Sequence, residues 1–199
     1  MSKPKIAIVV GSTRPNRFAD KPVAWFAEIA KGRSDVEVEI VDLKDYPMPL
    51  FAEPKSPKWG PSEDETARKW QAKLAEFDGF VFTAAEYNHA PTGVLKNALD
   101  YAGNEWARKP AGFIGYGSVG GARAVEQLRM IAIELQMAPV KAAVHIAWAD
   151  FLAVMQGTGK LEDMDHLNQA ATALLDEVVW WAKVLKAARA DDAQLAEAA

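Results

Sequence analysis

The stretch Lys5-Ile6-Ala7-Ile8-Val9-Val10, followed at once by Gly11-Ser12-Thr13-Arg14-Pro15-Asn16-Arg17, decides the fold. Its first half is a short apolar run, which is typical of a strand buried within a parallel sheet. Its second half is a polar turn that leads into helical spacing of apolar residues at Val23, Phe26 and Ala30. A strand–turn–helix unit of this kind predicts an α/β domain built on a parallel sheet.

Four further segments have the apolar pattern of strands, namely residues 36–41, 79–84, 111–117 and 140–146. Residues 36–41 and 140–146 alternate between apolar and other residues, as edge strands do, whereas the other runs are nearly continuously apolar. Between the strands, helical spacing recurs, including one helix over residues 95–106 and a last one over residues 167–185. We therefore predict a flavodoxin-like three-layer sandwich over residues 1–190, with five parallel strands in the order 2-1-3-4-5. Residues 191–199 are predicted to form a frayed polar tail.

The composition limits the possible functions. The 199 residues carry a formal net charge of −4 and include no cysteine. The lack of cysteine excludes disulfides and thiolate metal sites, and it fits a reducing compartment. Mild acidity argues against a nucleic-acid partner, and no apolar run is long enough to cross a membrane. The apolar run at residues 6–10 is too short for a signal peptide, so we expect a cytoplasmic protein.

Other features are less specific. The three histidines lie on different predicted elements, so we expect no metal site. The tryptophans are typical of a core or of an interface, which makes self-association plausible. Residues 44–61 contain five prolines and form a long loop that is either functional or a passive connector.

The first candidate binding loop is residues 11–17. Ligands of open parallel sheets bind at the carboxyl ends of the strands where the strand order reverses, here between the first and third strands. At this place the loop offers backbone N–H groups at the start of a helix, the hydroxyl of Ser12, and the guanidinium groups of Arg14 and Arg17, which suit a phosphate. An ordinary capped turn with two solvated arginines explains the composition equally well.

Two more loops end at the same predicted edge. In residues 85–93, an aromatic, an amide and a carboxylate can contact a flat ring and its polar border, although Asn88 and Thr92 are also typical of a helix cap. Residues 115–121 contain the formal pattern G-x-G-x-x-G of dinucleotide sites. It does not belong to the first strand–helix unit, and no carboxylate ends the next strand. We interpret it as a backbone wall against which a ring can lie.

Together these motifs resemble the NADPH-dependent FMN reductase family, which includes quinone, azo-dye and chromate reductases. The resemblance rests on Gly11-Ser12-Thr13-Arg14-Pro15 with Arg17, Glu86-Tyr87-Asn88-His89, Leu95-Lys96-Asn97-Ala98-Leu99-Asp100-Tyr101, and Gly120-Gly121-Ala122-Arg123-Ala124. They keep the family's order and spacing over residues 5–146. Two residues depart from the family pattern: Ala85 stands where members often have proline, and Asn16 where they often have glycine.

The resemblance implies a bound FMN (flavin mononucleotide) that passes electrons from NADPH or NADH to a small acceptor such as a quinone, a flavin, an azo compound or a metal oxyanion. It implies no catalytic residue, because the FMN carries the chemistry. It also suggests a homodimer or homotetramer with its contact near residues 94–106. The implied FMN-binding residues are Ser12, Arg14, Arg17 and Phe18 at the phosphate, and Ala85, Glu86, Tyr87, Asn88, Ser118, Gly120 and Gly121 at the ring.

Two alternatives keep the same fold. One is a flavodoxin-like electron carrier, which trades electrons only with proteins. The weak net charge and the loop arginines disfavour it, because carriers tend to show a strongly acidic docking face. The other is a regulatory domain that has lost the flavin, although the residue types that suit a phosphate are present.

Overall fold

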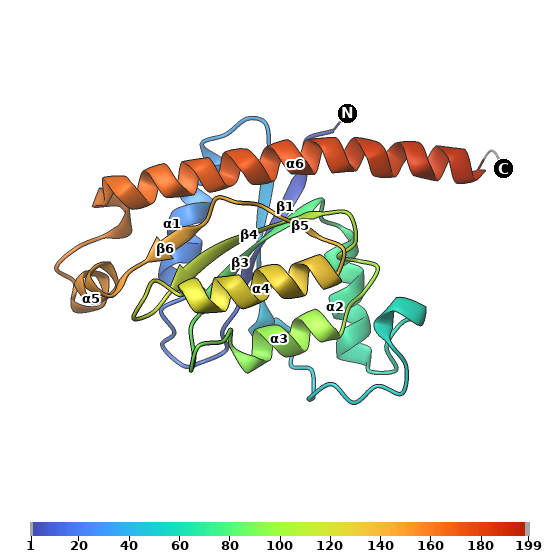
Figure 1. The fold of residues 1–199 in the computed structure, drawn as a ribbon, viewed down its shortest axis with the longest axis horizontal. Coiled ribbons are helices and arrows are strands. Elements are labelled where there is room, and N and C mark those ends of the chain that lie inside the picture. Colours follow the sequence, from blue (N-terminus) through green and yellow to red (C-terminus); the bar gives the residue numbers. More distant parts are fainter. Residues whose placement is uncertain (1, 198–199) are drawn as a thin grey trace.

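The apolar runs pair in parallel into one sheet, in the computed structural model that describes residues 2–197 (Figure 1). The strands are β1 (Lys5–Val10), β2 (Glu37–Asp42), β3 (Gly79–Ala85), β4 (Pro110–Tyr116), β5 (Ala138–Pro139) and β6 (Val144–Ile146). Their order is β2-β1-β3-β4-β5, and β6 also pairs with β4. The predicted order 2-1-3-4-5 is confirmed, and every strand pair is parallel.

The predicted fifth strand is interrupted, which corrects the expectation of one continuous strand over residues 140–146. The Val140 amide still donates to the Ala111 carbonyl of β4 at 2.9 Å. Beyond it, side chains from two helices bond the backbone in place of the sheet. Arg129 donates to the carbonyls of Val140 and Lys141, at 2.5 and 2.8 Å. Glu177 accepts from the amide of Ala142 at 3.0 Å. The chain therefore leaves β4 over residues 141–143 and returns to it at Val144.

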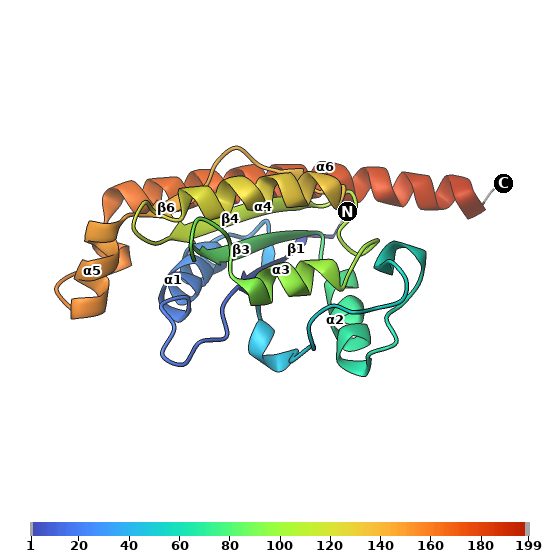
Figure 2. The same cartoon turned by 60° about the horizontal axis from the view of Figure 1, so that its bottom comes forward.

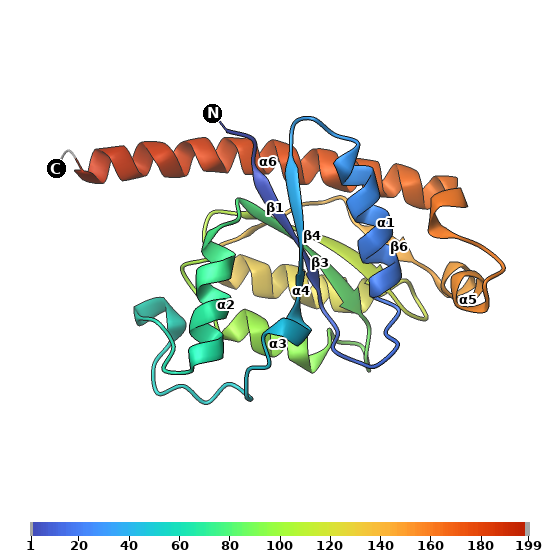
Figure 3. The same cartoon turned by 180° about the vertical axis from the view of Figure 1, so that it is seen from behind.

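Helices cover both faces of the sheet. They are α1 (Asp20–Lys31), α2 (Glu65–Ala75), α3 (Gly93–Asp100), α4 (Ala122–Glu134), α5 (Trp148–Gln156) and α6 (Asp165–Glu197), with 3₁₀ turns η1 (Leu43–Asp45), η2 (Pro57–Trp59) and η3 (Leu161–Asp163). Buried residues of α1 and α6 share one apolar core with one face of the sheet. Buried residues of α2, α3 and α4 form the other core. In Figure 3, where β2 is nearest the viewer, α1 and α2 lie on opposite sides of the strands. These are the three predicted layers.

The helices differ from the prediction at three places. Helix α3 ends at Asp100, so Trp106 lies beyond it, although its indole is fully buried and donates to the carbonyl of Leu99. Helix α5 was not predicted, and it lies at the end of the molecule near α1 and β6 (Figure 2). Helix α6 continues through residues 191–197 instead of ending before a frayed tail, and residues 198 and 199 lie outside the described residues.

The proline-rich loop follows β2 and is fastened to α3. The side-chain amide of Asn97 donates to the carbonyl of Pro49 at 2.7 Å and accepts from the amide of Phe51 at 2.8 Å. The two 3₁₀ turns η1 and η2 occupy its ends. Over residues 2–197, no helix combines the length and the apolar character that a membrane crossing requires.

Candidate functional site

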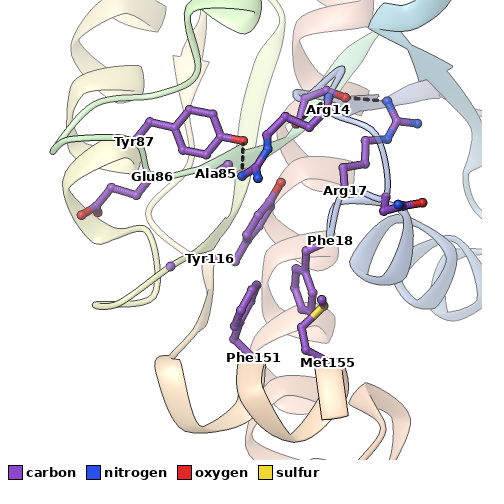
Figure 4. Close-up of a pocket in the computed structure, with 12 residues that line it drawn as sticks. Arg14, Arg17, Phe18, Ala85, Glu86, Tyr87, Tyr116, Phe151 and Met155 are labelled. Atoms are coloured by element: carbon purple, nitrogen blue, oxygen red, sulfur yellow. Dashed lines mark hydrogen bonds between the residues drawn. The ribbon is translucent and has the colours of Figure 1, made fainter. Parts of the chain in front are cut away.

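The loops after β1, β3 and β4 meet at one edge of the sheet and enclose a cavity of about 240 Å³ (Figure 4). Its lining residues are Ser12, Arg14, Asn16, Arg17, Phe18, Ala85, Glu86, Tyr87, Tyr116, Gly117, Phe151 and Met155. The cavity thus has a polar, cationic end on the β1 loop and an apolar end at Phe18 and α5. Part of the cationic loop and part of the predicted ring loop border the same space.

The β1 loop is fixed at its first residue. The amide of Gly11 donates to the hydroxyl of Thr83 at 2.9 Å, and the hydroxyl of Thr92 donates to the Gly11 carbonyl at 2.6 Å. A Cβ atom at position 11 would lie 2.1 Å from the Thr83 carbonyl oxygen, so only glycine fits. The Thr92 hydroxyl also accepts from the amide of Leu95 and caps α3, as one interpretation of the sequence predicts.

Arg14 and Asn16 form the exposed part of this loop. The Arg14 guanidinium lies 5.7 Å from the centre of the Tyr87 ring, and its Nη1 is 3.4 Å from the Tyr87 hydroxyl. This long hydrogen bond leaves most of its donors free for a ligand. Asn16 has a φ of 52°, in the left-handed region. The position where the family often has glycine therefore keeps the left-handed turn, because asparagine tolerates it better than most residues.

Arg17 is held by the protein. It donates from Nε to Asp20 at 2.7 Å, from Nη1 to the Ser12 carbonyl at 2.5 Å, and from both terminal nitrogens to Asp42 at the end of β2. These bonds raise the pKa of the Arg17 guanidinium, chiefly through Asp42. An arginine has five N–H donors, so four of them are already used. The sequence alone does not reveal this pairing, because Asp42 lies on another strand.

Glu86 is buried and ionised beside the cavity. Its side chain is 3% exposed. Its carboxylate accepts from the Nε of Arg123 at 2.5 Å and from the Arg123 amide at 3.1 Å. Burial by itself raises the pKa of the Glu86 carboxyl, but the hydrogen bonds from Arg123 outweigh burial and hold the pKa below its ordinary value. Glu86 therefore fastens the β3 loop to the start of α4.

The remaining predicted ring residues border the site without lining this cavity. Asn88 and Ser118 are exposed, and Gly120 and Gly121 are buried. Gly121 has a φ of 68°, and a Cβ atom there would lie 2.5 Å from the amide nitrogen of Tyr116. The backbone of the β4 loop thus packs directly on its own strand, in agreement with a wall that carries no side chain at this position.

Five cavity residues are not in the implied FMN-binding set. Asn16 and Gly117 lie in the predicted loops, whereas Tyr116, Phe151 and Met155 form the apolar end. Tyr116, the last residue of β4, is 6% exposed and packs on Phe18, with ring centres 5.1 Å apart. Phe151 and Met155 come from α5 (Figure 4). The alternation of β4 could have indicated Tyr116, because its neighbour Gly115 packs on the opposite side, against α4. Nothing in the three loops pointed to α5.

Comparison with known proteins identifies the family. The family NADPH-dependent FMN reductase matches residues 4–150, which is most of the chain. The chain belongs to this family. The resemblance noted from the motifs is thereby confirmed, and membership favours the reductase over the electron carrier and the flavin-free domain. Members of the family use NAD(P)H and FMN, so this chain is an NAD(P)H-dependent flavin oxidoreductase.

Individual relatives agree. The reductase is 34% identical to the NAD(P)H-dependent FMN reductase ntnL of Nectria sp, over 72% of this chain and 76% of the relative. It is 34% identical to a 2-hydroxy-1,4-benzoquinone reductase of Burkholderia sp, over 67% of this chain and 72% of that protein. Its fold is similar to that of FerB, a flavoenzyme NAD(P)H:(acceptor) oxidoreductase from Paracoccus denitrificans. The TM-score is 0.67 at 22% identity, over 88% of this chain and 97% of FerB.

The residues at the cavity fit FMN. A phosphate needs N–H and O–H donors and a cation, and Ser12 and Arg14 supply them on a loop that precedes α1. The hydroxyl of Tyr116 also faces this cavity, and none of the described residues is a hydrogen-bond partner for it. A flat ring needs aromatic and backbone surfaces, which the β3 and β4 loops provide. Over the described residues, no group of side chains could hold a metal ion.

Proposed function

We propose that the reductase holds the FMN phosphate on the β1 loop, with Arg14 as the principal cation. Ser12 and the backbone near Phe18 add uncharged donors, and Arg17 adds at most its one remaining N–H. This division of labour is supported by the contrast between the two arginines. Arg14 is exposed and its side chain makes a single long bond to Tyr87, whereas Asp42, Asp20 and the Ser12 carbonyl take four of the five Arg17 donors.

The isoalloxazine ring lies, in this proposal, against the two loops at the other side of the cavity. The first surface is formed by Ala85, Glu86, Tyr87 and Asn88, and the second by Ser118, Gly120 and Gly121. The amide of Glu86 donates to the Tyr116 carbonyl at 3.1 Å, so the two loops are joined at their bases. A fixed distance between the two surfaces is what a planar ligand requires.

Bound FMN supplies the electron and hydride chemistry, and the protein supplies binding and orientation. The ionised Glu86 carboxylate has no proton to give, and its role is to keep Arg123 in place beside His89 and Ser118. The Arg123 guanidinium, 36% exposed, is then a fixed positive charge at the ring side of the site. A fixed cation there favours any ligand group that gains negative charge on reduction.

The acceptor is a small molecule, and we propose a quinone as the first candidate because three relatives are named for quinone reduction. Free flavins, azo compounds and metal oxyanions are the other candidates. Either NADPH or NADH serves as the donor. Because donor and acceptor use one exposed face in turn, initial rates should give parallel double-reciprocal lines. Intersecting lines, which indicate a ternary complex, contradict this order of events.

We further propose a cytoplasmic homodimer or homotetramer with α3 near the contact. The loop that Asn97 fastens to α3 exposes two large apolar side chains, Leu50 at 84% and Trp59 at 79%. Exposed groups of this size next to a helix are typical of an interface. Light scattering coupled to gel filtration measures the mass, and Leu50→Asp with Trp59→Asp should reduce it to that of one chain. An unchanged mass removes this contact.

The phosphate assignment is tested by FMN titration of the apoprotein, followed by flavin fluorescence and visible absorbance. Arg14→Ala should weaken FMN binding at least about tenfold, because a charge-assisted bond of about 1.5–3 kcal/mol is lost. The affinity for riboflavin, which lacks the phosphate, should change little in Arg14→Ala. Arg108→Ala, which removes an exposed guanidinium paired with Asp192, is the control. An FMN affinity that survives Arg14→Ala refutes the assignment, and a wild-type protein that binds no FMN refutes the proposed function.

A further inference from the structure

The hydroxyl of Tyr116 faces the cavity and is not among the FMN contacts that the sequence motifs imply. The residue ends β4 and is 6% exposed, so more than nine-tenths of it is buried. Its backbone carbonyl accepts from Glu86, but among the described residues no side chain or backbone group bonds to its hydroxyl. The ring is thus buried while the hydroxyl oxygen opens into the cavity, because no fully enclosed side-chain oxygen or nitrogen among the described residues lacks a partner. A hydroxyl placed in this way is free to bond a ligand.

Aromatic packing fixes the direction of this hydroxyl. The Tyr116 ring lies against Phe18 at 5.1 Å between centres, and Phe18 lies against Phe151 at 4.5 Å. Trp148 stacks on Phe151 at 5.3 Å and 11°. This row of four rings reaches from the surface of α5 to the floor of the cavity. Figure 4 shows Tyr116 between Tyr87 and Phe18, with its hydroxyl at the end of the ring that is turned towards Arg14.

The surroundings of the hydroxyl select the kind of group it would bind. Burial raises the pKa of the Tyr116 phenol far above its ordinary value, so the hydroxyl stays neutral and can donate. Arg14 and Ser12 line the same cavity, and Arg17 has little donor capacity left. A neutral donor next to an available guanidinium is complementary to an anion rich in acceptor oxygens, which a phosphate monoester provides.

We propose that the Tyr116 hydroxyl donates a hydrogen bond to the phosphate of the bound cofactor, as a fourth-strand contact added to those of the β1 loop. The row Phe18–Phe151–Trp148 is then the support that positions it. Helix α5, most of which follows residue 150 where the family match ends, therefore contributes to cofactor binding through Phe18. This inference rests on the proposed FMN function and adds a residue to its phosphate site.

The test compares FMN and riboflavin as ligands of wild-type protein and of Tyr116→Phe, which removes the hydroxyl and keeps the ring. The dissociation constant for FMN should rise about five- to tenfold, while that for riboflavin should change less than twofold. Tyr101→Phe is the matched control. Tyr101 is 2% exposed and its hydroxyl likewise has no partner among the described residues, but it lies outside the cavity. Tyr101→Phe should leave both constants unchanged.

Each other outcome overturns the inference. An unchanged FMN constant in Tyr116→Phe means that the hydroxyl makes no contact, and an equal loss for both ligands places the contact on the ribityl chain or ring instead. Wild-type protein that binds FMN in either case shows that the proposed function itself stands. Phe151→Ala tests separately whether the row Phe18–Phe151–Trp148 positions the Tyr116 hydroxyl. It should weaken FMN binding in the wild-type background but have no further effect in Tyr116→Phe, and an additive loss overturns the supporting role.

Discussion

At the scale of single residues, two buried charges differ in how they are compensated. Glu86 has Arg123 as a direct partner, whereas the buried Lys109 has one bond, from its ammonium to the carbonyl of Leu74 at 3.1 Å. Desolvation accordingly lowers the pKa of Lys109 to about 8, and for Glu86 the partner outweighs desolvation and lowers the pKa. The carboxylate therefore stabilises the fold in its charged form, and the ammonium destabilises it.

For Glu86 we predict that Glu86→Gln lowers the free energy of unfolding at pH 7 by about 1–3 kcal/mol, because Arg123 loses its counter-charge while remaining partly solvated. The carboxyl pKa is below its ordinary 4.5 in the folded protein, so its stabilisation is complete above that value and is lost as the pH falls through the folded pKa. Urea denaturation at pH 7 and pH 3 measures the difference, which should shrink in acid. The exposed Glu65→Gln serves as control, and a difference that is the same at both pH values contradicts the prediction.

For Lys109 we predict the opposite sign, with Lys109→Met stabilising the protein at pH 7 by roughly 2 kcal/mol. A pKa lowered from 10.5 to about 8 corresponds to roughly 3 kcal/mol of destabilisation, which the substitution removes. The substitution also removes the bond to Leu74, which reduces the gain by about 1 kcal/mol. The unfolded state holds the proton more tightly, so the penalty is complete below pH 8 and fades between pH 8 and 10.5. The gain in the free energy of unfolding, measured by chemical denaturation, should be smaller at pH 9.5 than at pH 7. Lys69→Met, at an exposed position, is the control and should change this free energy by about zero at both pH values. A gain that does not depend on pH refutes the titration argument.

At the scale of elements, the proline-rich loop depends on one side chain. Asn97 makes two hydrogen bonds to it, at 2.7 and 2.8 Å, whereas Asn104 makes one bond, at 3.3 Å to Lys58. We predict that Asn97→Ala accelerates trypsin cleavage at Lys55 and Lys58 about tenfold or more, because the loop loses its attachment to α3. Asn104→Ala should have a smaller effect. Cleavage of Asn97→Ala at the wild-type rate excludes this role.

How far the elements could be predicted depends on whether their signals were local. The strand order followed from the apolar patterns, since buried and edge strands differ in alternation. The interruption of the fifth strand could not be predicted, because the bonds from Arg129 and Glu177 come from distant segments of the chain. Helix α5 was missed because no side chain caps its start and only Val154 is buried, so it has neither a start signal nor a wide apolar face.

The same distinction applies to the site. Ser12, Arg14 and Glu86 were predicted from motifs within single loops, and the structure brings all three to one cavity. The occupation of Arg17 by Asp42 was not predictable, since the pair is separated by 25 positions and joins two strands. Tyr116 was quoted within the glycine-rich loop, but its role depends on Phe151, which lies on the unpredicted α5. Sequence patterns therefore found the polar end of the cavity and missed the apolar end.

At the scale of the whole molecule, one carboxylate bonds α6 to the starts of two strands, in addition to the apolar core that α6 shares with the sheet. Asp78, just before β3, accepts from the amide of Lys5 at 3.0 Å, from Lys186 at 2.8 Å and from Arg189 at 2.7 Å. Its side chain is 13% exposed. The group thus connects the start of β1, the start of β3 and the second half of α6, whose last turns extend beyond the rest of the chain (Figure 1).

We predict that Asp78→Asn destabilises the protein by about 2–4 kcal/mol, because two cations on α6 lose their counter-charge in a partly buried place. Asp192→Asn, which removes an exposed partner of Arg108, should change stability by less than about 0.5 kcal/mol. Chemical denaturation of the three proteins checks both values. Equal stability of Asp78→Asn and the wild type refutes the contribution of these two pairs.

The glycines at the start of the β1 loop and at the end of the β4 loop also limit how this scaffold can be re-engineered. Positions 11 and 121 admit no side chain, since the added atom would meet backbone at 2.1 and 2.5 Å. Mutant libraries that aim to broaden the range of reducible compounds should leave both positions fixed. Diversity belongs at Val119, which is open to solvent on the same loop as Gly121 and outside the proposed ring surface. The geometry of the flavin cradle would then persist while its rim is varied.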